Sequence, residues 1–319
     1  MSGGGYRARM QWVTVHALAI SSALLSAFWA AVGIVVRQQI AQGVSDESAT
    51  GAVVNSVVRQ PLWWAGTLAA AAGYVFQAFA LAHGSLLLVQ PLLVSALLFA
   101  LPLSARVCHQ RVSWAEWGWA TLLTAALAIF VLVGQPREGH LRPALPAWTL
   151  ALAVSVPLVV ACVFVARRVT GRLRAMLLAV AVAVLLGMIA VMTKICTHRY
   201  AVGGWHGLLT VPAPYVLIAL AVTVTVVQQA AFHAGALQAS VPIMLVGEPV
   251  VAALLGVAVL GEHLAVKGSA APALLTAVVA MVASAIALGR GQAPSSDHSS
   301  RQREPSASDS DTAAMADAG

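Results

Sequence analysis

Long apolar runs alternate with short polar segments along most of the chain. A helix needs about 20 apolar residues to cross the hydrocarbon core of a bilayer, so each long run is a candidate transmembrane helix. Nine runs qualify, at roughly 13–36, 62–82, 85–105, 114–133, 147–166, 174–193, 212–233, 237–260 and 268–289. The pattern therefore predicts an all-α, multi-pass transmembrane bundle of about nine spans.

The polar segments set the expected domain organisation. Residues 1–10 form a short N-terminal tail, and a transmembrane domain follows over 11–290. Its first half covers about 11–134 and its second half about 147–290. Residues 291–319 are rich in Ser, Asp, Ala and Pro and have no apolar period, which predicts a disordered tail.

Two stretches of the chain resemble each other at a constant offset of 151 residues. VFQAFALAHGSLLLVQP (75–91) and VVQQAAFHAGALQASVP (226–242) share six identical positions. Each copy is a span, a tight glycine turn and a second span that contains proline. The seventh span comes five spans after the second, an odd number, so the two copies cross the membrane in opposite directions. Such an inverted-topology repeat is typical of secondary transporters.

Composition supports a membrane protein and argues against other classes. The chain is 60% hydrophobic and only 9% charged, whereas soluble domains have about 25% charged residues. The net charge of +7 would otherwise suggest nucleic acid as a partner. The basic residues lie mostly between or just outside the apolar runs, which indicates membrane topology and lipid headgroups instead.

The Lys and Arg residues also predict an orientation in the cell membrane. With nine spans, 11 of the 18 Lys and Arg residues fall on the side that holds the C-terminus. The clearest segment is RRVTGRLR (167–174), with four arginines in eight residues. Because cytoplasmic loops carry the excess of basic residues, we expect the C-terminus inside and the N-terminus outside.

The chain resembles the EamA-like members of the drug/metabolite transporter superfamily. The resemblance rests on the two glycine-turn hairpins and on EPVVAALLGVAVLGEHL (248–264), and it covers roughly 11–290. It implies a helical transporter built from two inverted halves.

Within that superfamily, the first half is most similar to NIPA-type magnesium transporters. The similarity lies in LWWAG (62–66) and GYVFQAFALAHGSLLLVQP (73–91). Those transporters have an acid directly after the glycine and an asparagine three positions later, where this chain has Tyr74 and Gln77. The missing acid removes a ligand that magnesium prefers, so the fold and the transporter class are the main implications of the resemblance.

An acidic residue inside the eighth predicted span is the leading functional candidate. Glu248 lies about 11 residues into the span, or about 16 Å along a helix, near the middle of a hydrocarbon core about 30 Å thick. Pro249 follows it and frees a backbone carbonyl. Together they could bind a cation or an amine, or couple transport to protons. The alternative is a protonated glutamate that hydrogen-bonds to a neighbouring helix.

Other polar, proline and glycine residues of the apolar runs complete the candidate site. Amides in a membrane must face the bundle interior or a wet cavity, so either substrate contact or interhelical hydrogen bonding is expected of them. The candidate lining residues are Tyr74, Gln77, Gln90, Gln228 and Gln229; the expected helix breaks are at Pro91, Pro242 and Pro249; the expected hairpin turns are at Gly84 and Gly235.

Two charged residues at span ends receive a structural interpretation. Glu262 follows the apolar run of the eighth span, and we expect it at the water boundary with Lys267 as its partner. Lys194 ends the sixth predicted span, and we expect its side chain to extend to the interface.

These observations lead to a function hypothesis with two alternatives. The chain lacks a phosphate-binding loop, HExxH and GxSxG motifs and standard zinc spacing, so we expect no enzyme, cofactor or bound metal. The hypothesis is a secondary transporter that moves a small metabolite, amine or drug by alternating access, with proton coupling as an option. The alternatives are a divalent-cation transporter and a non-transporting scaffold or lipid-carrier translocation partner. The expected partners are the bilayer and the substrate. A homodimer is a further option for the oligomeric state.

Overall fold

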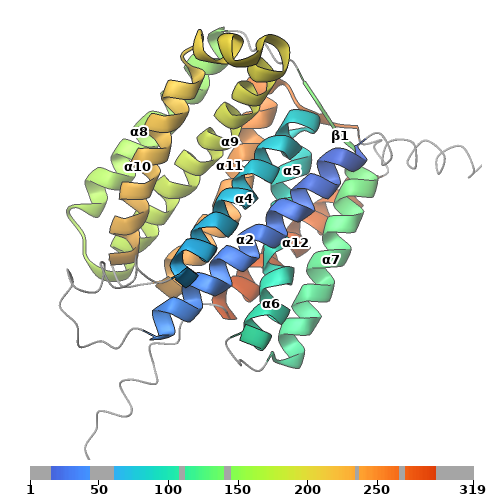
Figure 1. Ribbon diagram of the computed structural model, residues 1–319, viewed down its shortest axis with the longest axis vertical. Coiled ribbons are helices and arrows are strands. Elements are labelled where there is room, and N and C mark those ends of the chain that lie inside the picture. Colours follow the sequence, from blue (N-terminus) through green and yellow to red (C-terminus); the bar gives the residue numbers. More distant parts are fainter. Residues whose placement is uncertain are drawn as a thin grey trace, which may run out of the picture.

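The computed structural model describes residues 16–43, 61–107, 112–139, 145–233, 237–265 and 270–291. Within these residues the chain is almost entirely helical, and nine segments are long and apolar enough to span a membrane. The predicted all-α multi-pass bundle is therefore confirmed (Figure 1). The predicted tail at 1–10, nearly all of the predicted tail at 291–319, and the turn at Gly235 lie outside the described residues.

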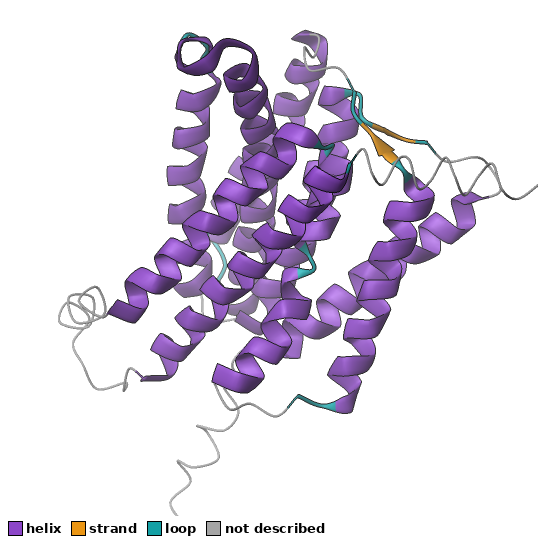
Figure 2. Ribbon diagram, turned by 45° about the vertical axis from the view of Figure 1, so that its right-hand side comes forward, coloured by secondary structure: helices purple, strands orange, loops and turns teal. Residues whose placement is uncertain are grey.

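The helices follow the predicted order of spans. The first half contains α2 (Ala17–Gly43), α4 (Pro61–His83), α5 (Leu86–Leu93), α6 (Ala96–Val107) and α7 (Trp114–Gly134). The second half contains α8 (Leu145–Ala166), α9 (Gly171–Leu209), α10 (Ala213–His233), α11 (Leu237–Leu260) and α12 (Ala271–Gly291). Two short strands, β1 (Pro136–Arg137) and β2 (His263–Leu264), pair antiparallel. Figure 2 shows this ribbon at one end of the bundle.

The two halves interlock in the bundle. In the first half α2 packs against α4 and α6, and in the second half α9 packs against α8, α10 and α11. The last helix, α12, leaves its own half and packs mainly against α7. Further contacts join α4 to α9 and α5 to α11 (Figure 1). The halves therefore meet through the pairs α4–α9, α5–α11 and α7–α12.

The third span is broken in its middle. It consists of α5 and α6, separated by a turn at Val94 and Ser95. Pro91 lacks the N–H that would continue the helical ladder. The N–H groups of Val94 and Ser95 donate three residues back, to the carbonyl oxygens of Pro91 (3.1 Å) and Leu92 (3.0 Å). The predicted helix break at Pro91 therefore corresponds to a tightened turn just after the proline. Pro242 and Pro249 lie inside the continuous helix α11.

The sixth span is longer than the apolar run that predicted it. We expected it to end near residue 193, but α9 continues to Leu209, with a kink at Gly204, where φ is 58°. Its 39 residues would measure about 58 Å if straight, whereas a bilayer core is about 30 Å thick. The prediction was wrong at this end because hydropathy marks where apolar side chains stop, and the helical backbone continues past that point.

Small residues let α9 and α11 approach closely. A Cβ added at Gly187 of α9 would lie 2.5 Å from Val251 Cγ1 and 3.0 Å from the backbone nitrogen of Ala252. A Cβ added at Gly247 of α11 would lie 2.6 Å from the Cβ of Ala183. Such contacts between small residues are a main source of packing energy between helices in a membrane.

Replacing Gly187 with leucine is expected to separate α9 from α11 and lower the melting temperature of the purified protein. The expected cost is about 3 kcal/mol, at the upper end of values for overpacked cores. Gly118 of α7 is the matched control, because a Cβ added there meets nothing within 4 Å. Thermal unfolding in detergent should show a clearly lower melting temperature for Gly187→Leu and little change in melting temperature for Gly118→Leu. Equal melting temperatures for the two variants would contradict the close packing of α9 on α11.

Candidate functional site

A buried ion pair lies near the end of the bundle that carries the β1–β2 ribbon. The Nζ atom of Lys194, on α9, is 2.8 Å from Oε1 of Glu262, which lies between α11 and β2. Both residues are almost completely buried, with exposures of 2% for Lys194 and 1% for Glu262. A buried ion pair is stable only when good geometry and further hydrogen bonds offset the loss of solvation.

Those further hydrogen bonds come from the start of α5. The N–H groups of Leu86 and Leu87 donate to Oε1 and Oε2 of Glu262, each at 2.9 Å. Lys194 Nζ donates to the carbonyl oxygen of Gly84 at 2.9 Å, and the N–H of Leu88 donates to Oγ of Ser85 at 3.1 Å. A carboxylate from the second half thus caps a helix of the first half, at the end where the helix dipole favours negative charge.

The chain is shaped locally to bring Glu262 to this position. Gly261, with φ of 66°, follows the last residue of α11. The N–H of Glu262 then donates to the carbonyl oxygen of Gly256 at 3.0 Å. A side chain at Gly256 would collide with this arrangement, because its Cβ would lie 2.9 Å from Glu262 Oε2. The two glycines therefore allow the carboxylate to turn back along α11 and reach α5.

A second acid lies at the outer edge of the pair. Oε1 of Glu138 is 3.8 Å from Lys194 Nζ, and its side chain is 39% exposed. Glu138 directly follows β1, and β1 pairs with β2 next to Glu262. The ribbon therefore places a solvent-exposed carboxylate beside the buried lysine.

The expectations for Glu262 and Lys194 were wrong in one respect. Both residues lie near span ends, as predicted, but neither side chain reaches water. They pair with each other, whereas Lys267, the partner expected for Glu262, lies outside the described residues. The nine-span topology put Lys194, Glu262 and Glu138 on one side of the membrane, and this was the signal from which the pair could have been found.

A larger cavity lies between the halves of the bundle. Its volume is about 210 Å³, and it is partly open. Every side chain that lines it is apolar: Leu87, Pro91, Val94, Phe130, Val246, Pro249, Val250, Ala253, Leu264, Val278, Met281, Val282 and Ala285. The walls come from α5 and its break, α7, α11, α12 and β2. Leu87 also connects the cavity to the ion pair, because its backbone N–H binds Glu262.

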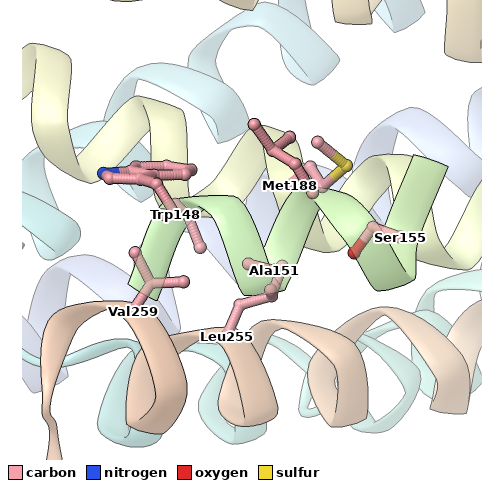
Figure 3. A pocket seen from close by; sticks show the side chains of 8 residues that line it. Trp148, Ala151, Ser155, Met188, Leu255 and Val259 are labelled. Atoms are coloured by element: carbon pink, nitrogen blue, oxygen red, sulfur yellow. The ribbon is translucent and has the colours of Figure 1, made fainter. Parts of the chain in front are cut away.

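A second, much smaller gap lies on the other side of α11. It is lined by residues of α8, α9 and α11, including Trp148, Met188 and Leu255 (Figure 3). Ser155 of α8 is its polar side chain, and Figure 3 shows Leu255 and Val259 of α11 facing α8. At about 10 Å³ this gap has room for at most one water molecule.

Glu248 lies on the side of α11 that faces away from the larger cavity. At 100° per residue, Leu255 lies within about 20° of Glu248 around the helix, while Pro249 and Ala253 lie 100° or more away. Glu248 is half-buried, about as far from Leu237 as from Leu260, so it is near the middle of α11. The structure therefore places this acid near the middle of α11, on the side of the helix that carries Leu255 and away from the larger cavity.

The other predicted lining residues are not gathered around one cavity. Tyr74 on α4 is 64% exposed, and Gln229 on α10 is also exposed. Gln77 and Gln228 are half-buried on α4 and α10. Gln90 is the fully buried member, with 1% exposure. None of them lines the larger cavity, although Pro91 and Pro249, the predicted helix breaks, do.

The fold and its polar residues define a class: an all-α, multi-pass membrane protein with an interlocked, two-half bundle. The chain is 39% identical to the uncharacterized protein Cgl0250/cg0304 of Corynebacterium glutamicum over 274 residues, which cover 86% of this chain and 95% of that protein. The chain belongs to the same family as this corynebacterial protein. No family model matches the chain, and no solved structure matches it.

Proposed function

We propose that the chain is a secondary transporter of the drug/metabolite transporter type, which moves a small organic molecule by alternating access. The observation that carries this proposal is the cavity between the halves. Its walls come from α5 and α7 of the first half and from α11 and α12 of the second. Rocking of one half against the other would change the shape of this cavity and its access from either side.

Two prolines in the cavity wall support the same proposal. Pro91 of α5 and Pro249 of α11 both line the cavity, and each interrupts the hydrogen-bond ladder of its helix. Secondary transporters bind substrate near the bilayer midplane, beside discontinuous helices. The break between α5 and α6 at the cavity wall fits this arrangement, since irregular backbone at that depth is tolerated where protein surrounds it.

The alternatives have less support from the same residues. Divalent cations prefer carboxylate, carbonyl and water oxygens, but the lining side chains of the cavity carry no oxygen. Within the residues that the structure describes, no group of three or more His, Cys, Asp or Glu residues could hold a metal ion. A scaffold would have no use for a cavity between two halves. An organic substrate is therefore favoured over magnesium.

Flux through the purified full-length protein in liposomes tests the proposal. Radiolabelled amines, neutral aromatic compounds and fatty acids should be offered with and without an imposed pH gradient, and magnesium should be followed with an indicator inside the vesicles. We expect saturable uptake of at least one organic compound and magnesium entry equal to that of protein-free liposomes. Saturable magnesium entry would favour the cation alternative. Absence of flux for every compound, with the protein folded, would contradict transport.

A further inference from the structure

We infer that the larger cavity binds the apolar chain of an amphipathic lipid-like substrate, and that the side-chain amide of Gln90 donates a hydrogen bond to an oxygen acceptor in its head. This inference names the substrate class for the proposed transporter and rests on that proposed function.

The chemistry of the cavity wall selects for an apolar ligand. The thirteen lining residues carry no polar side chain, and the volume of about 210 Å³ exceeds the space that a single water needs. A bound water requires two to four polar partners, so an apolar cavity of this size stays dry and takes an apolar ligand. A hydrated cation or a fully polar metabolite would face leucine, valine and phenylalanine side chains, and its own polar groups would be left unpaired.

The position of the cavity indicates that such a ligand comes from the bilayer. All its walls belong to membrane spans or to residues next to them, and the cavity is partly open. The lining residues extend over seven residue steps along each of three segments: from Leu87 of α5 to Val94 in the break, from Val246 to Ala253 of α11, and from Val278 to Ala285 of α12. Seven steps measure about 10 Å along a helix, so the cavity is long enough for part of an extended hydrocarbon chain. The hydrocarbon chain of a lipid from the surrounding bilayer therefore fits the length and the apolar wall of the cavity.

Gln90 supplies the polar contact. Gln90 does not itself line the cavity, but around the helix axis it lies about 60° from Leu87 and about 40° from Val94, which both do. The side chain is 1% exposed, and its Nε2 has no hydrogen-bond partner among the described residues. Folded proteins seldom leave a buried donor unpaired, because the lost hydrogen bond to water is then not replaced. A substrate oxygen that accepts from Nε2 accounts for this donor.

Binding of cis-parinaric acid to the full-length protein in detergent micelles tests the inference. This fluorescent fatty acid combines an apolar chain with a carboxyl oxygen acceptor. Wild-type protein should bind it saturably with one site per chain. Ala253→Trp, which fills the cavity, should weaken binding at least tenfold. Leu254→Trp is the matched control, because this neighbouring residue is 64% exposed and lies outside the cavity lining. Ala285→Phe on α12 repeats the test from the opposite wall.

Gln90→Leu separates a binding role from a structural role. If Gln90 holds the substrate, this variant should bind about tenfold more weakly and yet melt at a higher temperature, since it removes an unpaired buried donor. Unchanged affinity together with a lower melting temperature would overturn the role of Gln90. Wild-type affinity in both Ala253→Trp and Ala285→Phe would overturn the cavity as the site.

The inference and the proposed transport function can fail separately. Saturable binding of the fatty acid without flux of any compound would overturn transport and leave the binding site in place. Saturable flux of a polar compound that is unchanged in Ala253→Trp would overturn the inferred substrate class and leave transport in place.

Discussion

Replacing Lys194 with methionine is expected to destabilise the protein by about 3–5 kcal/mol, because the change leaves the carboxylate of Glu262 buried without its counter-charge. The carbonyl oxygen of Gly84 also loses its donor. A melting-temperature decrease of roughly 10 °C in detergent would correspond to this free energy. Arg199→Met is the matched control: Arg199 lies on the same helix but is exposed, and its replacement should change the melting temperature little.

The double variant Lys194→Met, Glu262→Gln tests whether the loss in Lys194→Met comes from the unpaired charge of Glu262. A neutral glutamine keeps an oxygen that can accept from one of the two α5 N–H groups, and no charge is then left unpaired. We expect the double variant to melt higher than Lys194→Met alone. Additive losses from the two single replacements would show that the residues are not coupled and would contradict the ion pair.

Replacing Glu248 with glutamine is expected to reduce proton-gradient-driven flux to the level of protein-free liposomes. Glutamine retains the shape of glutamate and cannot take up or release a proton, so a coupling step that uses this carboxyl group is lost. Glu248 is the acidic residue that lies far from both ends of a span among the described helices, and ionisable groups at that depth are usually functional.

The control for this experiment is Glu116→Gln. Glu116 belongs to the capping box at the exposed start of α7, where its side chain accepts a hydrogen bond from the N–H of Ser113 at 2.7 Å. The expected loss there is at most a small change in stability, with coupled flux retained. Coupled flux at the wild-type rate in Glu248→Gln would contradict a role of this carboxyl group in proton coupling.

The spans and their order could be predicted from the sequence because the bilayer imposes one simple requirement. Every spanning segment must be helical and apolar over about 20 residues, and such runs are visible without any tertiary information. A break at Pro91 was predictable because proline lacks an N–H, but the same reasoning predicted breaks at Pro242 and Pro249, which lie inside the continuous helix α11. The end of α9 was not predictable, because its last four turns or so and the kink at Gly204 lie beyond the apolar run.

The polar site was less predictable because it depends on which residues meet in space. Glu248 and the glutamines were selected for their positions within the apolar runs and the repeat, and position along a run does not say which side of a helix faces a cavity. Glu262 and Lys194 are 68 residues apart and were assigned to water because each lies at a span end. Their pairing requires the glycine turn after α11 to lie against the start of α5. The hydropathy pattern predicts neither the turn nor this contact.

The cap on α5 has a consequence for the order in which the protein is made. Glu262 is separated from Leu87 by 175 residues, and ribosomes add about 5–20 residues per second. The N-terminus of α5 is therefore synthesised roughly 10–35 s before the carboxylate that completes its hydrogen bonds exists. During that interval the third span has two backbone donors that lack their final partner, so a chain that stops before Glu262 is expected to hold the start of α5 less firmly.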